Sequence, residues 1–138
     1  LEMVNGEYFA WQDSDDISTS DRLEKLIAGI GENDGCFSYG YSFKSPNTNT
    51  RFLCSIDVSK YKDRESLYNN MFFPSGMFKA YLSSYKFDKR LRKREDVAWL
   101  TKMLKDGIKF GCVKEPLYFL RRHDGRLTTT AYAAPERK

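Results

Sequence analysis

Three aspartates near the start of the chain have the chemistry of a metal site. Asp13, Asp15 and Asp16 directly follow a run of aromatic strand formers, and aspartate ends strands because it favours turns. Three like charges within four residues are costly unless a positive partner neutralises them. Ligands of open α/β sheets bind just beyond the carboxyl ends of strands, and oxygen ligands suit Mg²⁺ or Mn²⁺. The alternative is a solvated acidic turn before a helix.

A second acidic pair, Glu95 and Asp96, stands at the start of a predicted helix. One of these carboxylates could act as a general base that takes a proton from a hydroxyl group. The helix N-terminus and the basic segment 86–94 would keep it ionised near neutral pH. Adjacent helical residues point about 100° apart, so only one is expected to face the reacting atom. Alternatively, the pair only interacts favourably with the helix dipole.

The elements that must position these side chains follow an α/β pattern. A helix after Asp21 is expected to begin with a capping box that Glu24 completes. Its apolar positions predict one buried stripe made of Leu23, Leu26, Ile27 and Ile30. A second helix is predicted over 95–106, ending at Gly107. Strands are predicted over 7–12, 36–43, 51–58 and 109–121, with an irregular strand over 72–78.

The composition is that of one ordinary globular domain. The chain has 138 residues, of which 41% are hydrophobic and 30% charged. Its net charge of +4 favours anionic ligands without requiring nucleic acid. Its three cysteines lack metal-type spacing, which predicts buried reduced thiols in a cytoplasmic protein. No apolar run approaches the roughly 20 residues that a membrane-spanning helix needs.

Four sequence blocks resemble a known enzyme family. The segment 6–16 with the Arg-Leu-Glu-Lys helix after it resembles the middle of a family 2 glycosyltransferase of the GT-A fold. The segments 94–100, 109–111 and 115–123 follow the same family's pattern in order. The resemblance covers residues 1–128. It implies a GT-A-like α/β mixed sheet flanked by helices, lacking the N-terminal nucleotide-binding βαβ segment, in one partial domain over 1–138 with a loose tail at 130–138.

The resemblance also implies an activity. Such an enzyme transfers a sugar from a nucleotide-diphosphate donor to an acceptor hydroxyl, with inversion through a single in-line displacement. The implied cofactor is Mn²⁺ or Mg²⁺, and the acceptor is a sugar or a lipid-linked molecule. The expected location is the cytoplasm, either free or peripherally at the inner face of the membrane, with no nucleic-acid partner.

Several residue roles come from the resemblance alone. Asp15 would hold the metal, and Asp16 would share or support that site. His123, the single histidine, would join the metal. Asp13 would face the nucleotide side of the donor.

The same resemblance assigns the remaining candidates. Asp96 would be the general base, and Glu95 would orient neighbours or bind the acceptor. Trp99 would either stack on an acceptor sugar or pack in the core. Arg122 and Arg126 could pair with the diphosphate, because the arginine fork matches phosphate oxygens.

Two other functions are open at the level of sequence. One is a metal-dependent phosphotransferase that uses the aspartates, although no phosphate-binding Gly-rich loop is evident. The other is a non-catalytic binding module for nucleic acid or an acidic polymer that uses the basic segment 86–94. Phe87 and Leu91 interrupt that segment, and carboxylates that would repel phosphate follow it.

Overall fold

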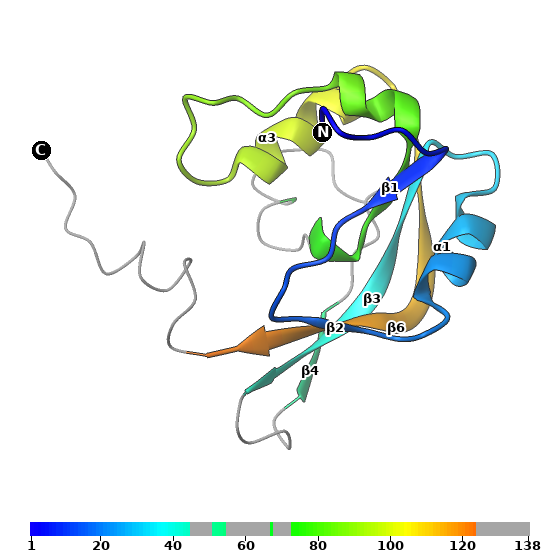
Figure 1. Ribbon diagram of the computed structural model, residues 1–138, viewed down its shortest axis with the longest axis vertical. Coiled ribbons are helices and arrows are strands. Elements are labelled where there is room, and N and C mark those ends of the chain that lie inside the picture. The colour runs from blue at the N-terminus through cyan, green and yellow to red at the C-terminus, as the bar shows by residue number, and fades with distance from the viewer. Residues whose placement is uncertain (45–50, 55–66, 68–72, 124–138) are drawn as a thin grey trace, which may run out of the picture.

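The computed structural model describes residues 1–44, 51–54, 67 and 73–123, and these form one curled mixed sheet with helices against it (Figure 1). The strands follow the order β1-β5-β3-β6-β2, and β4 pairs with β3. The strands are β1 (Tyr8–Ala10), β2 (Ile17–Ser18), β3 (Gly35–Lys44), β4 (Arg51–Cys54), β5 (Met77–Lys79) and β6 (Phe110–Arg122). The helices are α1 (Arg22–Ile30), α3 (Glu95–Lys105) and the 3₁₀ turns η2 (Phe73–Ser75) and η3 (Ala80–Ser84).

Alternation along the strands divides the core into two clusters. Phe37, Phe78 and Tyr118 pack in a cluster that also contains the buried residues of α3. Their neighbours in sequence pack with α1 in a second cluster, whose members are Cys36, Met77, Leu117, Leu26 and Ile30. Successive strand residues point to opposite faces of a sheet, so α1 and α3 cover opposite faces (Figure 1).

The parallel pair of β3 and β6 runs through the centre of the sheet. Its register extends from Gly35 opposite Phe110 to Lys44 opposite Arg122. The register shifts where Ser38 pairs with Val113 but Tyr39 pairs with Pro116. A proline lacks the N–H group that a ladder needs, so it fits at such an irregularity. Beyond this shift, β6 continues toward the chain segment that contains the aspartates.

Helix α1 differs from its prediction in two respects. Leu26 and Ile30 are buried, but Leu23 is 54% and Ile27 46% exposed, so the predicted stripe is only half buried. The helix therefore contacts the sheet along a narrower line than its apolar periodicity suggests. The capping box is also wrong, because Asp21 makes no side-chain cap and its carboxylate instead pairs with Lys25 Nζ at 3.0 Å.

The other elements largely match their predictions. Helix α3 and strand β6 lie where expected, and Gly107, with φ of +83°, follows the end of the helix. The first strand is shorter than predicted, and the segment 72–78 contains η2 before β5, because Pro74 cannot donate to a ladder. The predicted strand beyond residue 54 and the tail at 130–138 lie outside the described residues. No helix in the described part of the chain is long and apolar enough to cross a bilayer.

Candidate active site

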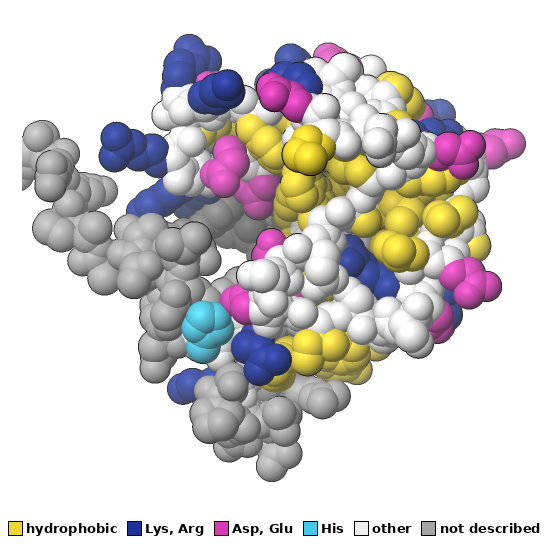
Figure 2. Space-filling view, in the orientation of Figure 1, with side chains coloured by type: hydrophobic (Ala, Val, Ile, Leu, Met, Phe, Trp, Pro, Cys, Tyr) yellow, Lys and Arg dark blue, Asp and Glu magenta, His cyan; other side chains and the backbone are white. Residues whose placement is uncertain are grey.

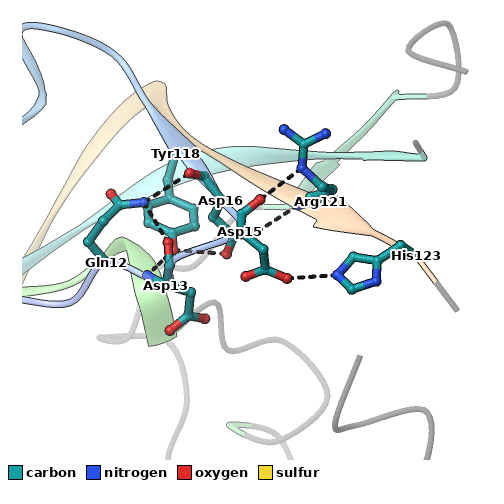
Figure 3. A network of polar contacts seen from close by, with 7 residues as sticks. All are labelled: Gln12, Asp13, Asp15, Asp16, Tyr118, Arg121 and His123. Atoms are coloured by element: carbon teal, nitrogen blue, oxygen red, sulfur yellow. Dashed lines mark hydrogen bonds and ion pairs between the residues drawn. The ribbon is translucent and has the colours of Figure 1, made fainter. Parts of the chain in front are cut away.

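Strand β6 holds the segment Asp13–Asp16, here called the aspartate loop, through its backbone and side chains (Figure 3). The Tyr118 hydroxyl accepts a hydrogen bond from the Asp13 N–H at 3.1 Å and donates to Asp16 Oδ2 at 2.9 Å. The Arg121 N–H donates to Asp16 Oδ1 at 2.8 Å, and its Nε donates to the Asp15 carbonyl at 2.9 Å. Burial raises the pKa of the Tyr118 phenol, so this donor keeps its proton.

These contacts separate the roles of two neighbouring aspartates. Both carboxylate oxygens of Asp16 accept hydrogen bonds from β6, and Asp16 is not among the residues that line the pocket described below. The geometry therefore favours the supporting role for Asp16 over a shared metal ligand. Asp15 has a different partner, because its Oδ2 lies 2.9 Å from His123 Nε2 (Figure 3).

The Asp15–His123 pair brings together two predicted metal ligands that are 108 positions apart in sequence. Both side chains are partly exposed, at 40% and 36%. No cluster of three or more metal-binding side chains occurs within the described residues. A metal ion held by this pair would thus need further ligands from a bound substrate and from water.

Arg22 fixes the aspartate loop from the side of α1. It is only 3% exposed, and its guanidinium lies 4.7 Å from the centre of the Tyr118 ring. Its Nη2 donates to the carbonyls of Trp11 at 2.9 Å and Pro74 at 2.8 Å, and its Nη1 donates to Gln12 Oε1 at 3.0 Å. These bonds set the direction in which the chain enters the loop. Sequence reasoning missed this residue, because an arginine in the first turn of a helix usually points to solvent.

A pocket of about 950 Å³ joins the aspartate loop to the start of α3. Asp13 and Asp15 line it together with His123, Glu95 and Asp96. The segment 87–92, which precedes α3, contributes further lining residues. Figure 2 shows a hollow on this face, with acidic side chains and His123 around it. The two acidic motifs of the sequence, together with the histidine, thus belong to one site.

Asp96 is partly buried in the wall of this pocket. Its Oδ1 accepts a hydrogen bond from the Val97 N–H at 2.8 Å. Burial, followed by the nearby charge of Glu95, raises the pKa of the Asp96 carboxyl above its ordinary value. Desolvation therefore outweighs the helix terminus that was expected to favour the ionised form, and it makes Asp96 a stronger base than an exposed aspartate. Glu95 also lines the pocket, which is compatible with its predicted role of orienting neighbours or binding the acceptor.

The comparisons with known proteins identify the family of this chain. The family model described as "Glycosyl transferase family 2" matches residues 1–86, which is more than half of the chain. The chain belongs to glycosyl transferase family 2. The matched region of this family 2 domain includes the aspartate loop and ends before Glu95. No curated protein matches the chain.

Two solved structures show the same GT-A-like fold. Residues 1–349 of Staphylococcus aureus TarS match with a TM-score of 0.56 and 19% identity, covering 87% of this chain and 37% of that one. A longer S. aureus TarS structure matches with a TM-score of 0.55 and 18% identity, covering 89% of this chain and 23% of that one. The family 2 domain described here therefore spans less than two fifths of the structures it matches.

Two predicted substrate contacts of this family 2 domain are not among the residues that line the pocket. Trp99 is 2% exposed and its Nε1 donates to the Tyr85 carbonyl at 2.8 Å, so of its two predicted roles the structure shows core packing and contradicts stacking on an acceptor sugar. Arg122 is exposed at the end of β6 and is not a lining residue. Arg126 lies outside the described residues. The cations that do line the pocket are Lys89 and Arg92.

Proposed function

We propose that this chain is part of a glycosyltransferase that moves a sugar from a nucleotide-diphosphate donor to an acceptor hydroxyl. One observation carries the proposal: a single pocket contains both the Asp15–His123 pair and the Asp96 carboxylate. The Asp15–His123 pair can hold a cation that neutralises the diphosphate of the donor. The Asp96 carboxylate can accept the proton of the acceptor hydroxyl. Family membership supports sugar transfer over the two alternative functions considered from the sequence.

The Asp15–His123 pair fits a divalent metal ion. A carboxylate oxygen and an imidazole nitrogen lie 2.9 Å apart and can turn toward one ion. Mg²⁺ prefers ligand sets made of oxygen, so this mixed pair favours Mn²⁺. When bound, the ion would stabilise the negative charge of the departing diphosphate as a Lewis acid.

Asp96 is the proposed general base. As the acceptor oxygen attacks the anomeric carbon, its proton passes to the Asp96 carboxylate and the bond to the diphosphate breaks on the opposite side. This single displacement inverts the configuration at the anomeric carbon. Asp13 lies on the same pocket wall as Asp15 and is the proposed contact on the nucleotide side. Lys89 and Arg92 bring positive charge to a pocket that five carboxylates of the described residues also line.

Calorimetric titration tests the donor side of the proposal. Uridine diphosphate and guanosine diphosphate are titrated into the protein with and without Mn²⁺. Mn²⁺ should raise the affinity for at least one of them, and Asp15→Asn should abolish that gain. Asp21→Asn removes the same charge from a surface aspartate that pairs with Lys25, and it should leave the gain intact. If Mn²⁺ raises neither affinity, or if both variants behave alike, the proposed donor site is wrong.

A further inference from the structure

Three aromatic side chains form part of the pocket wall. Trp11, Phe73 and Phe87, here called the aromatic platform, all line the pocket and are all partly exposed. Asp13, Asp15 and Asp96 line the same pocket. Figure 2 shows hydrophobic side chains directly beside acidic ones at the rim of this hollow. The pocket therefore offers apolar ring surface and hydrogen-bond acceptors to the same ligand.

The aromatic platform is held in place by contacts among its own three rings and by one buried ring behind them. Ring centres lie 5.4 Å apart for Trp11 and Phe73, and 5.8 Å apart for Trp11 and Phe87. Behind them, the buried Trp99 ring lies 5.4 Å from Phe87 and 5.7 Å from Phe73. The hydrogen bond from Trp99 Nε1 to the Tyr85 carbonyl fixes that backing ring. Trp99, for which sugar stacking was one of two predicted roles, thus supports the aromatic platform from behind, and the three rings of the platform line the pocket.

The composition of this wall suits a sugar ring. A pyranose ring has an apolar face of C–H groups and a rim of hydroxyl groups. Aromatic faces carry partial negative charge and attract such C–H groups, and carboxylates accept hydrogen bonds from hydroxyls. Ligand pockets commonly combine an apolar aromatic lining with a few placed polar groups. A bare phosphate or a metal ion would make no use of the three rings.

We infer that the aromatic platform binds the pyranose ring of a substrate, and this inference rests on the proposed function. Trp11 precedes Asp13 by two residues, and Phe87 belongs to the segment that leads into Asp96. The platform therefore adjoins both the proposed metal pair and the proposed base. The ring that it holds is either the transferred sugar of the donor or a sugar of the acceptor, and the probes below separate these two sources.

Binding measurements with four probes test the inference. Cellobiose represents a sugar acceptor, glycerol represents hydroxyls without a ring, and UDP-glucose is compared with UDP in the presence of Mn²⁺. Phe87→Leu keeps apolar volume but removes the aromatic face, and it should weaken binding of the sugar-bearing probe about 3- to 10-fold. It should leave the affinity for UDP unchanged. Tyr81→Leu removes an aromatic ring that is exposed outside the pocket, and it should change neither affinity.

Tryptophan emission gives a second readout, because the chain has only two tryptophans. In a Trp99→Phe protein the emission comes from Trp11 alone, and the sugar-bearing probe should change it saturably while glycerol does not. A response to cellobiose assigns the ring to the acceptor, and a response to UDP-glucose beyond that to UDP assigns it to the donor. The inference is overturned if neither sugar-bearing probe binds, or if Phe87→Leu binds both as wild type does. Loss of Mn²⁺-dependent UDP binding with intact cellobiose binding would contradict the donor site alone.

Discussion

Replacing Tyr118 with phenylalanine should weaken the attachment of the aspartate loop to β6, while the hydrogen bonds from Arg121 remain. The variant keeps the buried ring beneath Arg22 but removes the hydroxyl that joins Asp13 to Asp16. A hydrogen bond to a carboxylate contributes about 1.5–3 kcal/mol, and a neutral one contributes about 0.5–1.5 kcal/mol. Losing both should lower the free energy of unfolding by about 2–4.5 kcal/mol. For a chain of this size, that corresponds to a fall of roughly 6–15 °C in melting temperature.

Urea and thermal unfolding of wild type and Tyr118→Phe measure this loss. Tyr81→Phe is a matched control, because the Tyr81 hydroxyl also donates to a carboxylate, that of Asp34 at 2.6 Å, but the residue is 52% exposed. An exposed hydrogen bond is replaced by water, so the control should lose less than about 1 kcal/mol. The reasoning is refuted if the two variants lose equal stability, or if Tyr118→Phe unfolds like wild type.

Three further predictions address the base, a thiol and the packing of α1 on β6. Asp96→Asn should lower transfer by the whole protein about 10²–10⁴-fold. It should also stabilise the fold at pH 7, because burial raises the pKa of the carboxyl and makes its ionised form costly in the folded state. That gain in stability should disappear below about pH 4, where the carboxyl of the unfolded chain is protonated as well. Thermal melts at several pH values measure the gain, and a variant that is less stable than wild type at pH 7 would contradict the prediction. Burial raises the pKa of the Cys36 thiol to about 11, so iodoacetamide at pH 8 should label Cys112 first, and equal labelling by mass spectrometry would refute this. Gly111→Ala should cost about 1–3 kcal/mol in urea unfolding, because its Cβ would lie 2.8 Å from the Gly29 carbonyl, and an unchanged midpoint would show that α1 can move away.

The periodicity of apolar residues correctly predicted the elements whose apolar side chains are buried by neighbouring elements. Helix α3 shows three buried residues at helical spacing, Val97, Leu100 and Met103, and β3 alternates aromatic residues with small or polar ones. The same reasoning overestimated the buried face of α1. Periodicity identifies a stripe but does not say how much of its width a sheet will cover, and Leu23 and Ile27 fall outside the contact.

The site depends on contacts between distant parts of the chain, which local patterns do not contain. The resemblance supplied the pairing of Asp15 with His123, and the structure places the two side chains together. The same approach left Trp99 open between a sugar contact and the core, because both environments favour an aromatic ring. It gave no sign of Arg22, two of whose partners are backbone carbonyls, which any sequence possesses.

The most direct test of the central claim is the location of Mn²⁺ in crystals grown with UDP. Anomalous diffraction near the manganese absorption edge identifies the ion independently of the surrounding density. The proposed function predicts a single strong peak within coordination distance of both Asp15 and His123, with diphosphate oxygens completing its shell. A manganese peak bound elsewhere, or UDP bound in the pocket with no manganese beside this pair, would contradict the claim.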